Sequence, residues 1–509
     1  MGGGKRPSSG DALEAPRKKP KAGSAKALTQ ETGKLSGEEA EAYFKANQVN
    51  VSVPDGKDVD IAPLSGFRHD GFAKKLMKYC EGKFESPTPI QACCWPIIMQ
   101  RCDVCGIAKT GSGKTMGFAL PYLSMSRKGI LENFEQPVNT PRFVCMAPTR
   151  ELAMQIAEVC TELSQALGDG YPVLCVYGGV PKREQRRSLQ EEGVDMLIAC
   201  PGRLQDLAND GSVDLSHVQY LVLDEADRML DMGFIDTVKG LIDQMPKAGV
   251  RQTCMFSATW PASIHHLATQ FLASPAMVAI GNFQDSGGLA ANKAIRQEVE
   301  VLKDEKEKPT RLLHHLKKHY APDKKVIVFG LYKKEAAWLE NFLWGKGYEK
   351  VIALQGDMSQ EKRTKAIADF KETKSTPLIA TDVASRGLDV KDVELVINYT
   401  FPLTIEDYIH RIGRTGRAGK SGLAICFFCP ESKGAQDEKA HAGDLVRVLK
   451  EAGQTVPPDL ERLSSTSGGN KATKKKDHPL FGKFFKSAEQ MAALEAKKVH
   501  TTFADSDDE

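Results

Sequence analysis

Two segments constrain this chain more than any others: an apolar strand that leads into a glycine-rich loop, and an apolar strand that ends in acids. The loop reads Ala-Lys-Thr-Gly-Ser-Gly-Lys-Thr over residues 108–115, and the acid-ended strand reads Tyr-Leu-Val-Leu-Asp-Glu-Ala-Asp over residues 220–227. Small residues let the loop's backbone N–H groups surround phosphate oxygens, and the following helix N-terminus adds its dipole. Together the segments predict the two halves of a nucleotide–magnesium site.

Each side chain of this predicted site has a distinct chemical task. Lys114 is expected to reach the β- and γ-phosphates, and the Thr115 hydroxyl to ligate Mg²⁺. Asp224 is expected to hold the ion through water, which leaves Glu225 to orient or activate the attacking water. A structural glycine turn could explain a lone loop, but the acid-ended strand favours ATP hydrolysis. The remaining loop residues would contact the nucleotide: Ala108, Lys109, Thr110, Gly111, Ser112 and Gly113.

Composition excludes some other classes of protein. The formal net charge of +3 is close to balance, so nucleic-acid binding would have to come from local patches. The twelve cysteines are scattered through apolar runs, which predicts reduced thiols in the cytosol or nucleus. The pairs Cys102/Cys105 and Cys426/Cys429 lack further metal ligands at suitable spacing, so we interpret them as core residues. We expect no secretory signal and no membrane span.

Strands and helices alternate in two long regions, which predicts an α/β fold with two tandem parallel-sheet domains. The first domain is expected over residues 61–281 and the second over 295–453, with a linker at 282–294. Residues 1–60 are interpreted as a disordered basic tail, and 454–509 as a polar and basic tail with an acidic end. Since the phosphate loop occurs only in the first domain, the second is expected to complete that site.

A basic turn in the second domain is the candidate for this contribution. It reads His-Arg-Ile-Gly-Arg-Thr-Gly-Arg over residues 410–417, after a predicted helix at 404–410. Buried arginines are costly unless they face anions, so the alternative is a solvated turn. A bidentate guanidinium suits a γ-phosphate whose charge spreads in the transition state, and such residues raise rates roughly 10³–10⁵-fold. We therefore expect Arg414 and Arg417 to reach the γ-phosphate.

The motifs, taken in order from Phe67 to Arg417, resemble those of the DEAD-box RNA helicases of superfamily two. This resemblance implies two RecA-like domains. It also implies that residues 65–93 form a Q motif, in which Gln91 reads adenine and Phe67 and Phe84 lie beside the base. An amide pairs with both N6 and N7 of adenine. Asp389 would contact the ribose.

The resemblance also implies an RNA-dependent ATPase that locally unwinds RNA duplexes or remodels RNA–protein complexes. It would contact mainly the RNA backbone, with little sequence specificity. The residues implied for RNA contact are Arg150, Gly179, Gly202, Arg203, Gln360, Arg363 and Thr381. Those implied for coupling hydrolysis to unwinding are Ser257, Thr259, Asp227 and His410.

Shorter segments resemble the nucleolar ribosome-assembly branch, in particular the fungal "DEAD-box protein three" group. These are residues 259–261, 289–293, 368–371, 401–407, 456–460 and 474–478. They imply a monomeric nuclear and nucleolar enzyme that acts on large-subunit pre-rRNA in pre-ribosomal particles. A cytoplasmic enzyme, a helicase acting on messenger RNA, an ATP-gated RNA clamp without productive unwinding and a DNA translocase are the alternatives. The Q motif and the acids at 224–227 argue against the last.

Three positions depart from the family pattern, and two tail segments carry further expectations. Lys83 replaces a usual Gly, Gln355 a usual His, and Cys200 a usual Thr, whose lost hydrogen bond to RNA would cost ~1 kcal/mol. The basic run at 17–21 is either a nuclear import signal or a solvated tail. The lysines and aromatic residues at 474–486 are either an RNA anchor or an inert tail.

Overall fold

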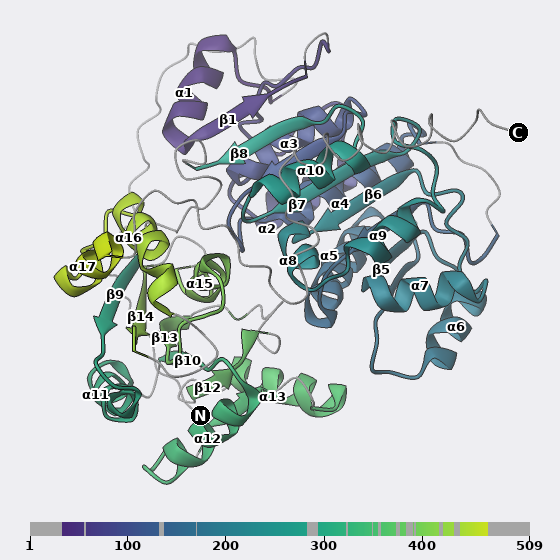
Figure 1. Cartoon of the computed structure of the whole chain (residues 1–509). Coiled ribbons are helices and arrows are strands. Elements are labelled where there is room, and N and C mark those ends of the chain that lie inside the picture. Colours follow the sequence, from purple (N-terminus) through teal and green to yellow (C-terminus); the bar gives the residue numbers. More distant parts are fainter. Residues whose placement is uncertain are drawn as a thin grey trace, which may run out of the picture.

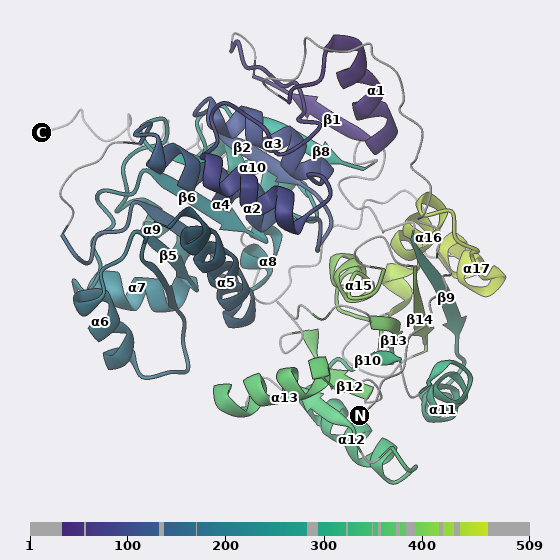
Figure 2. The ribbon, with the colours of Figure 1, turned by 180° about the vertical axis from the view of Figure 1, so that it is seen from behind.

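The computed structural model describes residues 33–54, 57–131, 137–168, 170–281, 294–321, 324–348, 350–354, 358–372, 377–382, 390, 393–416, 421–431 and 438–466. These residues form two α/β domains, each built on its own parallel sheet (Figure 1). The predicted fold class is therefore confirmed. Figure 2 shows the same two bodies from behind, with helices covering their sheets.

The sheet of domain 1 has the strand order β1-β8-β2-β7-β6-β3-β5-β4. Its strands are parallel except β1, which pairs antiparallel with β8. Strands β2, β3, β5 and β6 are almost entirely apolar and are buried along their whole length, as is typical of parallel sheets covered on both faces. The strands are β1 (Val49–Ser52), β2 (Val104–Ile107), β3 (Phe143–Met146), β4 (Val173–Val176), β5 (Met196–Ala199), β6 (Tyr220–Asp224), β7 (Gln252–Ser257) and β8 (Ala276–Ile280).

Successive strand residues enter different cores on the two faces of this sheet. On β3, Phe143 and Cys145 belong to one core, and Val144 and Met146 to the other, since side chains alternate along a strand. The helices are α1 (Gly37–Asn47), α2 (Lys74–Lys83), α3 (Pro89–Met99), α4 (Lys114–Arg127), α5 (Arg150–Leu167), α6 (Lys182–Glu191), α7 (Pro201–Asn209), α8 (Ala226–Asp231), α9 (Ile235–Ile242) and α10 (Ala262–Phe271).

Domain 2 has the parallel strand order β11-β12-β10-β13-β14-β9. Its strands are β9 (Ile295–Val301), β10 (Lys325–Phe329), β11 (Ile352–Leu354), β12 (Pro377–Ala380), β13 (Val393–Asn398) and β14 (Gly422–Phe428). Its helices are η1 (Glu305–Glu307), α11 (Lys308–His319), α12 (Lys333–Trp344), α13 (Gln360–Glu372), α15 (Ile405–Ile412), η2 (Glu438–His441), α16 (Ala442–Glu451) and α17 (Pro458–Thr466).

The prediction of a disordered N-terminal tail over residues 1–60 is wrong for its described part. Ser36 and Glu39 form a capping box at the start of α1, in which the Ser36 N–H donates to Glu39 Oε2 at 3.1 Å. The next segment adds a strand to domain 1, with Val49 opposite Ile280 and Val51 opposite Val278. This cap and the alternating valines are local signals that the polar composition of the whole segment obscured.

The tail predicted from residue 454 is also partly folded. Helix α17 packs on α16, and Leu460 is fully buried in the core of domain 2. Residues 1–32 and 467–509 lie outside the described residues, and with them both tail segments singled out above.

All twelve cysteines are free thiols, and Cys102, Cys105, Cys426 and Cys429 are buried, as predicted for core residues. Burial raises the pKa of each of these four thiols. Within the described ranges, no helix is long and apolar enough to cross a membrane.

Candidate nucleotide site and interdomain contacts

The phosphate loop joins β2 to α4 at the carboxyl end of the domain 1 sheet. Gly113, immediately before α4, has φ +86°, and a Cβ there would lie 2.5 Å from Gln91 Nε2, so this position needs glycine. Lys114 is 7% exposed, and its Nζ donates to the Ala108 carbonyl at 2.9 Å and the Lys109 carbonyl at 3.3 Å. The ammonium group therefore lies inside the loop, beside the N-terminus of α4, where an anion is favoured.

The Q motif is connected directly to this loop. Gln91 Nε2 donates to the Gly113 carbonyl at 2.9 Å, and Gln91 Oε1 accepts from the Thr88 N–H at 3.0 Å. The sequence predicted adenine recognition by this amide; the structure adds a link between the first turn of α3 and the phosphate loop. One amide hydrogen and one oxygen lone pair remain for a base, because an amide has two donor and two acceptor positions.

The two aromatic residues expected beside the base differ in exposure. Phe67 is 5% exposed, and its ring centroid lies 6.4 Å from that of Phe84 and 6.1 Å from that of Trp95. Phe84 is 40% exposed, so it presents the more accessible ring of this cluster.

The acids end β6, two strands from the phosphate loop in the same sheet. Asp224 is buried and accepts from the Glu225 N–H at 3.0 Å. Burial raises the pKa of Asp224 to about 7, although Lys114 opposes this shift. Glu225 has φ +51°, a left-handed conformation that costs a non-glycine residue about 1–2 kcal/mol and is tolerated mainly at functional sites.

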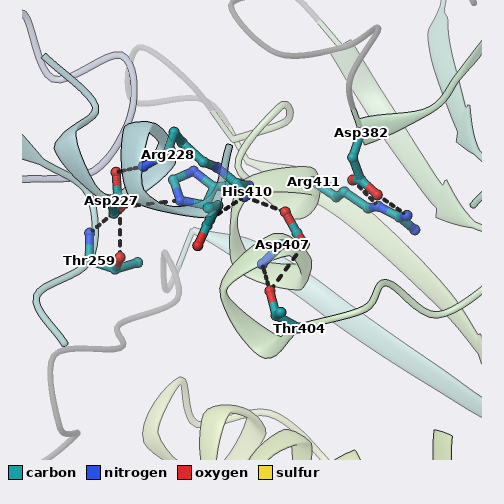
Figure 3. A network of polar contacts seen from close by, with 9 residues as sticks. Asp227, Arg228, Thr259, Asp382, Thr404, Asp407, His410 and Arg411 are labelled. Atoms are coloured by element: carbon teal, nitrogen blue, oxygen red, sulfur yellow. Dashed lines mark hydrogen bonds and ion pairs between the residues drawn. The ribbon is translucent and has the colours of Figure 1, made fainter. Parts of the chain in front are cut away.

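Three of the predicted coupling residues meet at one carboxylate oxygen (Figure 3). The backbone N–H and the hydroxyl of Thr259 donate to Asp227 Oδ2 at 3.0 and 2.6 Å. His410 Nε2, from α15 of domain 2, lies 3.4 Å from the same oxygen. Burial acts to raise the pKa of Asp227, but His410, Thr259 and Arg228 outweigh it and hold that pKa well below its usual range.

The fourth predicted coupling residue, Ser257, does not join this cluster. It is fully buried at the end of β7, and its hydroxyl has no hydrogen-bond partner within the described ranges.

A second interdomain contact was not predicted from the sequence. Arg228 on α8 bonds Asp231 at 3.1 Å and also forms a very short ion pair with Asp407 on α15. Thr404 caps α15, and its hydroxyl accepts from the Asp407 N–H at 3.1 Å and donates to the Asp407 carboxylate at 3.1 Å. Thr404 thus holds the Asp407 carboxylate in the first turn of α15, where Figure 3 shows it pointing toward Arg228.

The arginine turn approaches the phosphate loop from domain 2. A Cβ built on Gly413 would lie 3.2 Å from Thr110 Oγ1, so the backbone of this turn is close to the Thr110 side chain of the loop. Arg414, the next residue, is 6% exposed. Arg411 faces an internal anion: its Nε and Nη2 donate to the two oxygens of Asp382, each at 2.6 Å. Arg417 and Asp389 lie outside the described residues.

The residues expected on RNA in domain 1 are braced by protein contacts. A Cβ on Gly179, where φ is +86°, would lie 2.2 Å from Arg150 Nη1, so another residue there would be strained and would displace this guanidinium. Arg203 donates to Gln185 Oε1 at 2.8 Å and to the Val180 carbonyl at 3.0 Å, so it supports the loop after Gly179.

Two departures from the family pattern, and one further predicted residue, lie in the same domain. Gly202 is in the first turn of α7, where its Cβ position is open. Cys200, its N-cap, is a buried thiol without a side-chain cap bond, and burial raises its pKa to about 12. Lys83 ends α2 and pairs with Glu162. Gln355 lies outside the described residues.

In domain 2, Arg363 reaches across the boundary between domains. Its Nε lies 2.7 Å from Oε1 of Glu151 in the first turn of α5. Thr381 follows β12 and is 6% exposed, and Gln360 begins α13. The α13 contact therefore lies on a different part of the boundary from the α15 contacts.

Comparison with known proteins identifies the family that the sequence motifs resemble. Residues 88–267 match the DEAD/DEAH box helicase family, and residues 307–419 match the helicase conserved C-terminal domain. The ATP-dependent RNA helicase DBP3 of Saccharomyces cerevisiae is 46% identical over 458 residues, which cover 89% of this chain and 82% of that protein. The DEAD-box ATP-dependent RNA helicase 5 of Oryza sativa is 45% identical over 475 residues, 93% of this chain and 87% of that one. The chain belongs to the DEAD-box ATP-dependent RNA helicases.

This DEAD-box helicase also resembles solved structures with ligands bound. Mss116p bound to single-stranded RNA and AMP-PNP aligns with a TM-score of 0.65 and 27% identity over 78% of this chain and 80% of that one. Dbp5 of S. cerevisiae bound to RNA and ADP BeF3 aligns with a TM-score of 0.62 and 28% identity over 78% of this chain and 97% of that one. The helicase is thus an RNA-dependent ATPase with two RecA-like domains.

Proposed function

We propose that this helicase remodels RNA by closing its two domains around ATP and RNA together. The contacts made by α15 carry this proposal, because they join α8, which follows the acid-ended strand β6, to the helix that leads into the arginine turn. Asp227 reaches His410, and Arg228 reaches Asp407, so both contacts exist only while the domains are together. A ligand that binds the closed state more tightly shifts the equilibrium toward it, so ATP and RNA would favour each other's binding.

The site residues fit a magnesium–nucleotide complex. Thr115 in the first turn of α4 and the buried Asp224 provide oxygen ligands of the type that Mg²⁺ prefers. Because burial makes the charged form of Asp224 costly, a cation beside it is favoured. A Mg²⁺ held by these residues would neutralise part of the phosphate charge. Glu225 then orients or deprotonates the attacking water, and Arg414, with Arg417, stabilises the charge that develops.

The RNA is proposed to lie across the edge formed by the loop at Gly179, the start of α7 after Cys200 and Thr381 after β12. The resemblance of the short sequence segments to the ribosome-assembly branch supports large-subunit pre-rRNA in pre-ribosomal particles as the substrate. The same resemblance, together with the basic run at 17–21, supports a nuclear and nucleolar location for a monomeric enzyme.

Glu225→Gln provides the test of both parts of this proposal. The substitution removes the base but keeps the shape, so we expect kcat to fall roughly 10²–10⁴-fold while ATP and RNA stay bound. Ultraviolet crosslinking of this variant to RNA in cells should then give reads clustered on large-subunit pre-rRNA. Reads dispersed over messenger RNA would contradict the substrate but not the ATPase, and unchanged turnover would remove Glu225 from the mechanism. Strand displacement by the wild type separates an unwinder from an RNA clamp.

A further inference from the structure

One helix of domain 2 exposes aromatic residues that the ATPase does not use. Tyr332, just before α12, is 51% exposed, and Trp338 and Trp344 within it are 45% and 66% exposed. These are three of the eight large hydrophobic side chains that are exposed in the described part of the chain. They fall within thirteen consecutive residues, and Trp338 and Trp344 lie about 120° apart around the axis of α12, with Lys334 between them in angle, so together they border the surface on its exposed half. We call this surface, with its flanking lysines, the α12 face.

The inner side of α12 explains why these rings point outward. Ala336, Leu339 and Leu343 are fully buried in a core of domain 2, and their spacing defines one side of the helix. Trp338 projects from the remaining side, and its ring stacks on Phe342, with centroids 5.0 Å apart and an interplanar angle of 11°. The stack holds the Trp338 ring in a fixed orientation while leaving it about half exposed.

The charges on the α12 face are of one sign. Between residues 331 and 348, all of which are described, every exposed charged residue is a lysine: Lys333, Lys334 and Lys346. Of the two glutamates, Glu335 is half-buried and accepts from the Thr400 hydroxyl at 2.5 Å, and Glu340 is half-buried with a pKa that burial raises. Aromatic rings interleaved with lysines are the composition of single-strand nucleic-acid binding surfaces.

The position of α12 connects this face to the proposed RNA path. β10 and β12 are paired in register, with Phe329 opposite Ala380 and the Gly330 N–H donating to the Ala380 carbonyl at 3.0 Å. The chain leading to Tyr332 and the chain leading to Thr381 therefore leave the same edge of the sheet. From that edge α12 runs outward, beside α13 at the end of domain 2 farthest from α1 (Figures 1 and 2). Trp344 lies about 9 Å beyond Trp338 along the helix axis.

We propose that the α12 face is an accessory stacking surface for unpaired RNA that extends beyond the core path. Bases stack on Tyr332, Trp338 and Trp344, and the three lysines contact phosphates. This proposal rests on the proposed function in one respect: the RNA is taken to reach α12 from Thr381. A protein partner is the competing occupant, but the lysine-only charge favours a polyanion.

The test compares two oligouridines in the presence of Mg²⁺ and AMP-PNP, one filling only the core path and one about three times as long. For the full-length Trp338→Ala/Trp344→Ala variant we expect about tenfold weaker binding of the long RNA, and unchanged binding of the short one. Val250→Ala, which truncates a 70% exposed side chain in domain 1, is the matched control. ATPase stimulation by the short RNA should be unchanged, which separates failure of this proposal from failure of the core function.

Two further readouts identify the occupant. The long RNA should quench the fluorescence of the wild type more than that of a Trp338→Phe/Trp344→Phe variant, because the chain has only four tryptophans and Trp95 is buried. Lys346→Ala should lower the salt slope of long-RNA binding by about 0.7. Equal affinity of the double alanine variant for long RNA would overturn the proposal. If that variant keeps both RNA affinities but no longer sediments with pre-ribosomal particles, the face binds a protein instead.

Discussion

Two buried arginine–aspartate pairs lie close together in this helicase and differ in where their partners come from. Arg411, 1% exposed, is paired with Asp382, and both belong to domain 2. Arg228, 3% exposed, is paired with Asp407 across the boundary between the domains. Figure 3 shows both pairs around α15, which supplies Arg411 to one and Asp407 to the other.

The Arg411 pair belongs to the folded structure of domain 2, whereas the Arg228 pair belongs to the closed arrangement of the two domains. The Arg411 pair must form whenever domain 2 folds, because both charges are then buried together. The Arg228 pair needs only the approach of two folded domains, and water can solvate both groups when the domains separate. One contact should therefore govern unfolding, and the other should govern closure.

Breaking the internal pair should have the largest effect. Arg411→Ala leaves the Asp382 carboxylate without its bidentate partner and opens a cavity, so we expect domain 2 to lose about 3–5 kcal/mol of unfolding free energy. Urea unfolding of the full chain measures this loss. A matched Arg411→Met/Asp382→Leu variant should recover much of the stability. A loss below about 1 kcal/mol in the single variant would contradict the comparison.

Breaking the interdomain pair should affect binding rather than unfolding. We expect Arg228→Ala to weaken RNA binding in the presence of AMP-PNP by about 10–100-fold, because one charge-assisted contact of the closed state is lost. RNA binding without nucleotide should change little. Asp407→Ala should give a similar loss, and a double-mutant cycle should show that the two losses are not additive. If RNA affinity fell equally with and without AMP-PNP, Arg228 would contact RNA directly instead of stabilising the closed state.

The interdomain pair of Arg363 and Glu151 extends this comparison to the proposed RNA-binding edge. Arg363→Gln and Glu151→Gln should each weaken RNA binding with AMP-PNP by about tenfold, since each breaks the same nearly buried contact. If Arg363 contacts RNA directly, its substitution will be the more damaging of the two. Fluorescence anisotropy with a labelled oligouridine distinguishes these outcomes.

The smallest effect is expected from pH. Burial, aided by Arg228, lowers the pKa of His410 in the closed state, so the open state takes up the proton more readily. Acid should therefore favour opening, and RNA affinity with AMP-PNP should fall about fourfold between pH 7.5 and 6.0 if the open state has an ordinary histidine pKa. His410→Gln should remove this part of the pH dependence. An affinity that rises toward pH 6.0 would mean that the Asp227 contact stabilises protonated His410.

Local sequence predicted the fold and the phosphate half of the site because those features depend on short segments. The loop at 108–115 and the strand at 220–227 carry their own geometry, and the parallel sheet brings their ends to one edge. The Arg228–Asp407 pair could not be predicted, because its residues are 179 positions apart and meet only when two domains are placed together. The bond from Gln91 to Gly113 could not be predicted either, since it depends on how α3 packs against the loop.

The added strand β1 fixes the point from which domain 2 is tethered. Val49 pairs with Ile280, and the Gly281 N–H donates to the Gln48 carbonyl at 2.8 Å, so the sheet of domain 1 holds the chain up to Gly281. The other end is held at Ala294, whose carbonyl accepts from the Gly422 N–H at 3.2 Å. Thirteen residue steps can span at most roughly 45 Å. The two halves of the ATPase site therefore stay within a limited distance of each other when the domains separate. The number of residues between Gly281 and Ala294 sets the effective concentration of one half at the other.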